Sequence, residues 1–205
     1  MTTDNTEQRI LDAAQQLFLE RGFALTSTTD IARLAGCNQA LVHYYFRTKE
    51  NLLRRIYLQN ATLLLQLVGD TLQADMSFEQ MVRSVIAAYF RFISEQPKLP
   101  YFIINEIINN AERRQYIRQH ITAHFRFNDI ARQFTMRLKE EHQAGRIINI
   151  SPLDLVLHVV SLTVFTFISI PMYQEIFACD EEALQAYIAR REEEITRFVL
   201  RGIAM

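Results

Sequence analysis

Glycine and proline are scarce in this chain. It holds five Gly and four Pro in 205 residues, where average usage gives about fourteen and about ten. No Asn-Gly or Asp-Gly pair occurs, although sheets need a turn signal every ten residues or so. The scarcity excludes an all-β protein and predicts an all-α fold.

Groups that carry chemistry are also few. Cys37 and Cys179 are the two cysteines, and there is no CxxC pair or histidine at metal-ligand spacing, so neither a disulfide framework nor a metal site is expected. The sequence has no glycine-rich phosphate loop and no nucleophile–base pair. We therefore expect no enzyme activity and no cofactor. The polar stretch at residues 2–9 does not resemble a secretory signal, and together with the reduced cysteines this predicts a cytoplasmic protein without a membrane partner.

Residues 155–170 form a stretch of sixteen residues without a formal charge, whereas about 20 apolar residues are needed to cross a bilayer. The run contains several hydroxyl side chains and stops at Pro171. It is interpreted as a helix buried between other helices, within the subunit or across an interface.

Charge is balanced overall at −1, but it is unevenly distributed. Residues 33–55 carry five basic side chains against the single acid Glu50. This segment therefore predicts a local positive face. The five are Arg33, Arg47, Lys49, Arg54 and Arg55.

Capping residues predict where the helices begin. A first helix is expected at about 5–21, and short helices follow Ser27 and Asn38. Longer helices are expected after Thr48, Ser77, Ser151 and Asp180, with a short helix at 100–109. Residues 112–144 read as one long helix or as two joined near His120.

Residues 27–46 predict a helix-turn-helix. Gly36 separates two short amphipathic segments, and the second of these is narrow enough to enter a major groove about 12 Å wide. Ile31, Ala32, Ala35, Leu41 and Val42 are expected to hold the pair together, with Gln39, His43 and Tyr44 facing outward.

The same stretch resembles the DNA-binding domain of the tetracycline-repressor (TetR) family. The resemblance rests on Thr29, Ile31-Ala32, Ala35-Gly36, Tyr45-Phe46 and Lys49-Glu50-x-Leu52, preceded by Ala13-Ala14, Leu17-Phe18 and Gly22-Phe23. It implies a DNA-binding domain at 1–50 and a ligand-binding and dimerisation domain at 51–205. It also implies that Thr28, Thr29 and Lys49 lie at phosphate, that Asn38, Gln39 and Ala40 lie near base edges, and that His43, Tyr44 and Tyr45 lie along the DNA backbone. Ala40 replaces a frequent glycine and His43 a usual tyrosine, which leaves the phosphate contact of His43 open.

A small-molecule pocket is a further implication of the resemblance, although aromatic residues at helical spacing are more often plain core. The candidate ligand residues are Tyr89, Phe92, Phe102, Asn105, Glu106, Asn109, His124, Phe125, His158 and Thr166. His158 can equally be a core or interface histidine.

The last helix repeats apolar positions at 4-3 spacing, which is typical of a helix that packs along a partner. With the apolar helix 152–170 it predicts a homodimer through Leu184, Ile188, Arg191, Ile195 and Phe198. The resemblance then implies a repressor that a small-molecule effector releases from a palindromic operator. A ligand-independent regulator or an activator stays open, and so, more remotely, does a helical ligand-binding protein or enzyme.

Overall fold

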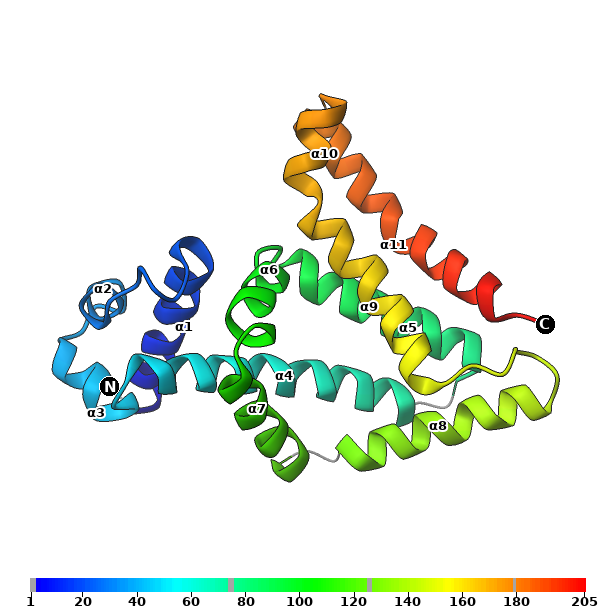
Figure 1. Cartoon of the computed structure of the whole chain (residues 1–205), viewed down its shortest axis with the longest axis horizontal. Coiled ribbons are helices and arrows are strands. Elements are labelled where there is room, and N and C mark those ends of the chain that lie inside the picture. The colour runs from blue at the N-terminus through cyan, green and yellow to red at the C-terminus, as the bar shows by residue number, and fades with distance from the viewer. Residues whose placement is uncertain (1–2, 74–75, 125–126, 179) are drawn as a thin grey trace. The chain divides into compact units, whose positions relative to one another are not determined.

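The computed structural model describes residues 3–73, 76–124, 127–178 and 180–205, which are almost entirely helical (Figure 1). Within these residues the only β-structure is an isolated bridge between Ile147 and Ala204. The predicted all-α class is confirmed. The helices are α1 (Thr3–Arg21), α2 (Thr28–Leu34), α3 (Gln39–Phe46), α4 (Lys49–Gln73), α5 (Phe78–Ser94), α6 (Leu99–Ile103), the π-helix η1 (Ile104–Ile108), α7 (Ala111–His124), α8 (Phe127–Gln143), α9 (Pro152–Ile168), α10 (Ile170–Phe177) and α11 (Glu181–Ile203).

The chain forms two compact units. The first unit contains residues 1–63 and 101–124, and the second contains residues 64–100 and 125–205. The chain passes from one unit to the other within α4 and within α6. The division at residue 50 into a DNA-binding and a ligand-binding domain stays a prediction.

Capping side chains begin the helices where the sequence predicts. The Oγ atoms of Ser27 and Ser77 each accept a hydrogen bond from the backbone N–H of the residue three positions later. The side chain of that residue accepts from the backbone N–H of the serine in return, which completes a capping box. Asn38, Ser151 and Asp180 cap α3, α9 and α11 in the same way. Each cap satisfies a backbone N–H that the helix leaves without a partner.

Apolar side chains of α1 form the centre of the first unit. Ile10, Ala14 and Phe18 are at most 1% exposed. α1 packs against α2, and α2 packs against α3, so the short helices are held by a helix long enough to bury one full face. The Phe18 ring stacks on the Phe102 ring with centroids 6.2 Å apart. Residues 101–124 thus share a core with the N-terminal helices.

The second unit is built around α5, α9 and α11, which pack against one another. Ile86 and Ile195 are almost completely buried, and Phe90 contacts Phe167 with ring centroids 5.2 Å apart. Gly69, near the end of α4, lies against α8, since a Cβ there would stand 3.3 Å from Ile130 Cδ1. The missing side chain therefore permits a close approach of these two helices.

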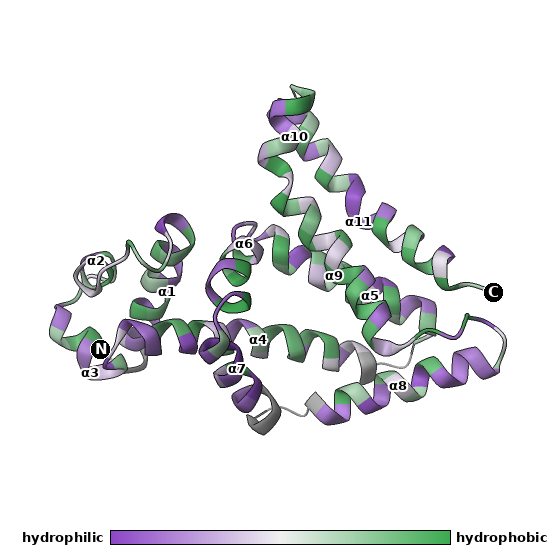
Figure 2. Cartoon of the chain, viewed as in Figure 1, coloured by the Kyte–Doolittle hydropathy of each residue, from purple (hydrophilic) through white to green (hydrophobic). Residues whose placement is uncertain are grey.

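The uncharged run 155–170 is only partly buried within its unit. Leu155, Val159 and Phe167 face the core, whereas Leu157 and Phe165 are exposed. Figure 2 shows α9 mainly in hydrophobic colours, in contrast to the hydrophilic α7. Among the described residues no single helix is long and apolar enough to cross a bilayer, and α9 and α10 reach that length only as a pair bent by 55°.

One helix boundary follows a predicted alternative, and another differs from the prediction. The stretch 112–144 contains two helices, α7 and α8, which was one of the two alternatives. Pro171 does not end the helical structure, because it lies in the first turn of α10. Proline is well tolerated in a first helical turn, where its missing N–H would have no partner.

Candidate nucleic-acid interface

The turn between α2 and α3 has the geometry of a helix-turn-helix. Gly36 adopts a positive φ of 63°, which favours glycine because it has no Cβ to clash with the carbonyl. Cys37 N–H donates to Ala32 O at 3.0 Å and closes the turn. Ile31, Ala32 and Val42 are at most 3% exposed, so the predicted small core is confirmed at these positions.

The start of α3 is fully open on its outer face. Asn38, Gln39 and Ala40 are exposed. Asn38 Oδ1 accepts from Leu41 N–H at 2.9 Å, which leaves the Asn38 amide hydrogens available to an acceptor on DNA. Gln39 Nε2 donates to Thr28 Oγ1 at 2.8 Å. This bond joins the first turns of α2 and α3, and leaves the Gln39 carbonyl oxygen available.

Further along α3, the aromatic residues divide between the surface and the interior. Tyr44 is 73% exposed, and its ring meets the half-buried Tyr45 edge-on, with centroids 5.2 Å apart. Tyr45 in turn contacts Phe46, which is buried. His43 is exposed, with Nδ1 at 3.2 Å from Arg47 O and Nε2 at 3.5 Å from Gln39 Nε2. The open Tyr44 hydroxyl and the exposed imidazole can therefore reach a DNA backbone.

Lys49, at the first position of α4, is half-buried. Its Nζ donates to Phe23 O at 2.7 Å and to Thr26 O at 2.8 Å, and it lies 4.3 Å from the centroid of the Phe23 ring. An ammonium group has three hydrogens, so one donor is left over. Lys49 thus fixes the loop before α2, and the sequence did not predict this role.

A buried ion cluster lies beneath this loop. The Arg113 side chain is 11% exposed. It donates to both oxygens of Glu50 at 3.0 and 2.8 Å, and to Glu106 Oε2 at 2.6 Å and Glu106 O at 3.0 Å. Its Cζ also lies 4.5 Å from the Phe23 ring centroid. Burial lowers the pKa of Arg113, but the hydrogen bonds to Glu50 and Glu106 outweigh it, so the pKa lies above its ordinary value.

The sequence does not predict the ion cluster of Arg113, because its partners come from other parts of the chain. Glu50 is 63 positions away, and nothing in the pattern of either residue points to the other. Glu106 is only seven positions from Arg113, but the two residues lie on different helices, η1 and α7, so helical spacing does not pair them.

The predicted ligand residues are divided between the two units and stay a prediction. Tyr89, Phe92, His158 and Thr166 belong to the second unit, whereas Phe102, Asn105, Glu106 and Asn109 belong to the first. His124 ends α7, with a side chain that is not described, and Phe125 lies outside the described residues.

The environments of these residues differ as well. Phe92 and Phe102 are buried, and Asn105 and Asn109 are exposed on the surface. His158 is also exposed, so the expectation of a core histidine within the subunit is wrong. Thr166 is buried and accepts from Arg191 Nε at 3.1 Å. Glu106 is occupied by the ion cluster.

The residues predicted for the dimer interface do not share one exposed face. Leu184 and Ile195 are at most 5% exposed inside the second unit, whereas Phe198 is 68% exposed. Ile188 and Arg191 are half-buried. Positions 184 and 195 are three helical turns apart and therefore point the same way, while position 198 is rotated by about 60°.

The first unit thus presents a capped, exposed recognition helix on a tightly packed support, which defines a helix-turn-helix protein of the all-helical class. Residues 10–56 match the family model described as bacterial regulatory proteins, tetR family. The predicted resemblance to the tetracycline-repressor family is confirmed.

Named relatives align with the same segment. The transcriptional regulator QacR of Staphylococcus aureus is 36% identical over 52 residues, which are 25% of this chain and 28% of QacR. TtgR of Pseudomonas putida is 35% identical over 51 residues, which are 25% of this chain and 24% of TtgR. The matched region thus spans less than a third of each of these two relatives.

Solved structures resemble the whole chain. The transcriptional regulator FadR of Bacillus subtilis, solved with stearoyl-CoA, has a TM-score of 0.70 and 18% identity over 96% of this chain and 99% of FadR. The haemolysin II regulator HlyIIR has a TM-score of 0.65 and 20% identity over 100% of this chain and 99% of HlyIIR. At this identity the likeness concerns the fold.

Proposed function

We propose that this protein is a sequence-specific DNA-binding transcriptional regulator. The observation that carries the proposal is the exposed first turn of α3, where Asn38, Gln39 and Ala40 stand clear of the protein. Amide side chains can bond base edges, and an alanine methyl can meet the methyl group of thymine. This part of α3 would then read sequence in the major groove.

Phosphate contacts would set the register of α3 on the duplex. Thr28 and Thr29 stand in the first turn of α2, which attracts anions because its N–H groups point outward. His43, Tyr44 and Tyr45 would follow the DNA backbone along α3. Lys49 would use its remaining hydrogen for a phosphate while its other two hold the loop of Phe23 and Thr26.

A homodimer is the second part of the proposal. Leu153, Leu157 and Phe165 lie on α9 at spacings of four and eight, and each is more than half exposed. Leu153 and Leu157 are neighbours on the helix surface, and Phe165 is rotated by about 80° from Leu157. An exposed apolar surface of this kind is typical of a protein–protein contact. A second copy would cover it, and its two-fold axis would place two reading heads on a palindromic operator. Met172, Ile176, Phe177 and Phe198 add exposed apolar side chains on α10 and α11.

Release by a small molecule is the third part. The fold resembles that of a regulator solved with stearoyl-CoA. An effector of this chain would act by weakening its hold on DNA. Coupling of about 1–3 kcal/mol changes affinity by about 5- to 150-fold. The ion cluster of Glu50, Glu106 and Arg113 supports such coupling, because Glu106 is a candidate ligand residue and Glu50 lies in the first turn of α4.

The proposal is tested by letting the purified protein select duplexes from a random library, at a stated salt concentration. We expect enrichment of a palindrome whose half-sites are about one helical turn apart or slightly more. The same selection with an Asn38→Ala, Gln39→Ala variant is the control and should lose the enriched sequence. Enrichment that is identical in both proteins would overturn the assignment of α3 as the reading helix.

A further inference from the structure

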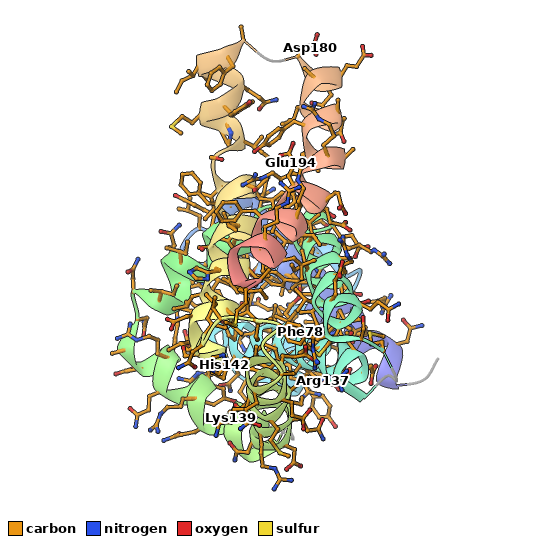
Figure 3. All side chains as sticks on the ribbon, turned by 90° about the vertical axis from the view of Figure 1, so that its right-hand side faces the viewer. Phe78, Arg137, Lys139, His142, Asp180 and Glu194 are labelled. Atoms are coloured by element: carbon orange, nitrogen blue, oxygen red, sulfur yellow. The ribbon has the colours of Figure 1, made fainter. Side chains whose placement is uncertain are left out.

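A groove of about 750 Å³ lies in the second unit, where α5 begins and where α8 and α11 approach their ends. Figure 3 faces this side of the unit, with Phe78 and Arg137 labelled close together. None of the predicted ligand or DNA-binding residues lines it. Its charged lining consists of Arg83, Arg137, Arg146, Arg197 and Arg201 with Glu79, Glu141 and Glu193.

Two of the arginines form ion pairs with all three of these carboxylates. Arg83 binds Glu79 at 2.9 Å and Glu193 at 3.2 Å. Arg146 binds Glu141 at 2.5 Å, and the hydrogen bond from Arg146 holds the pKa of the Glu141 carboxyl below its usual value. Among the described residues that line the groove, five guanidinium groups against three carboxylates leave two positive charges in excess.

The other three arginines, at positions 137, 197 and 201, have no carboxylate at ion-pairing distance within the described parts of the chain. Arg137 is the most informative. Its Nη2 donates to Met76 O at 2.6 Å, whereas its Nε is buried and has no partner among the described residues. A buried donor without an acceptor destabilises the folded chain.

The first turn of α5 adds to the same preference for an anion. Ser77 and Phe78 line the groove, and the Ser77 hydroxyl caps only the N–H of Gln80. The N–H groups of Phe78 and Glu79 precede the first hydrogen-bonded turn and have no intrahelical acceptor. The positive end of a helix of 17 residues therefore faces the groove together with Arg137, Arg197 and Arg201.

We propose that this groove binds a small polyanion, a molecule carrying a phosphate or diphosphate group. The planar fork of a guanidinium matches two phosphate oxygens at once, and several such forks around one groove favour a multiply charged group over a single carboxylate. The site extends the proposed function by a second binding site, and it does not depend on DNA binding.

The proposal is tested by calorimetric titration of the full chain with inorganic diphosphate. Sodium chloride adjusts every solution to the same ionic strength. We expect saturable binding of one diphosphate per chain and a higher Tm in its presence. Arg137→Met should weaken binding by about tenfold or more, because a hydrogen bond to a charged group is lost. Arg201→Gln, at an exposed position, should weaken it as well and keeps the test valid if Arg137→Met does not fold.

Arg190→Gln is the matched control, since Arg190 is exposed on α11 and does not line the groove. It should leave the affinity for diphosphate within about twofold. Absence of saturable binding would overturn the proposal, and so would equal losses in the Arg201→Gln and Arg190→Gln proteins, which would reveal attraction by net charge alone.

Discussion

The guanidinium of Arg113 forms a two-point ion pair with the carboxylate of Glu50, at 2.8 and 3.0 Å, and so joins α7 to the first turn of α4. The same guanidinium holds Glu106 of the π-helix at 2.6 Å. Short π-helical segments often occur at functional sites. The N-terminal helices are thereby linked to residues that come some fifty positions later in the chain, inside one compact unit.

Loss of this link should be costly. Arg113→Met leaves two carboxylates close together and half-buried, and breaking a buried pair costs about 3–5 kcal/mol. We expect the free energy of unfolding, measured in urea, to fall by about 3 kcal/mol. Arg83→Met removes an exposed cluster and is the control, with a much smaller expected loss, because water and salt screen exposed ion pairs. Equal small losses in both variants would refute the structural role of Arg113.

Lys49→Ala should affect DNA binding and stability together. Loss of one phosphate contact lowers the slope of log affinity against log salt by about one for every duplex. Loss of the bonds to Phe23 O and Thr26 O should reduce the free energy of unfolding by about 1–3 kcal/mol.

Fluorescence anisotropy at several salt concentrations, paired with urea unfolding, measures both effects of Lys49→Ala. Lys98→Ala, at an exposed site of the second unit, should change neither. Reduced stability with an unchanged salt slope would show that Lys49 makes no phosphate contact and only stabilises the loop.

The proposed dimer can be broken through its exposed apolar face. Leu157→Glu and Phe198→Glu place charges on side chains that are 52% and 68% exposed in one chain, so each chain should still fold. Sedimentation should then report half the mass of the wild-type protein. Tyr101→Glu alters an exposed aromatic residue of the first unit, 64% exposed, and should remain dimeric. Retention of a stable dimer by the double variant would show that another surface is used.

Acid should weaken the second unit through Glu141. The hydrogen bond from Arg146 lowers the pKa of Glu141. The stability from this pair is therefore complete above the ordinary carboxyl pKa, about 4.3, and disappears as pH falls through the lowered pKa of the folded protein. Urea unfolding at about pH 6 and about pH 3 should show a smaller loss for Glu141→Gln than for the wild type. An identical pH dependence would exclude a contribution from this pair.

Local signals in the sequence predict where the helices begin. They do not predict which distant side chains meet in ion clusters. Ser27, Asn38, Ser77, Ser151 and Asp180 act within three residues of themselves, so their caps are readable from the chain alone. The helix-turn-helix was predictable for the same reason, since Gly36 and the small core around Ile31 are local.

The sequence does not predict which distant side chains pair, or which face of a helix packs inward. The partners of Arg113 are brought together by the packing of α4, η1 and α7, which no local pattern encodes. On α11 the 4-3 spacing was correct as a pattern, but it joined Ile195, which packs inward, with Phe198, which faces outward. Spacing alone does not distinguish a helix stripe that packs within its own subunit from one that packs on a partner.

Gln39 is expected to read a base pair of the operator. To test this, the affinities of Gln39→Ala and wild type are compared on the selected duplex and on a set of its single-base variants, at one fixed salt concentration. We expect Gln39→Ala to cost about 1–3 kcal/mol on the selected duplex and to lose discrimination at one base pair of each half-site. Gln185→Ala, at an exposed glutamine of α11, should bind like wild type. An equal loss by Gln39→Ala on every duplex, with discrimination intact at all positions, would show that Gln39 does not read the sequence.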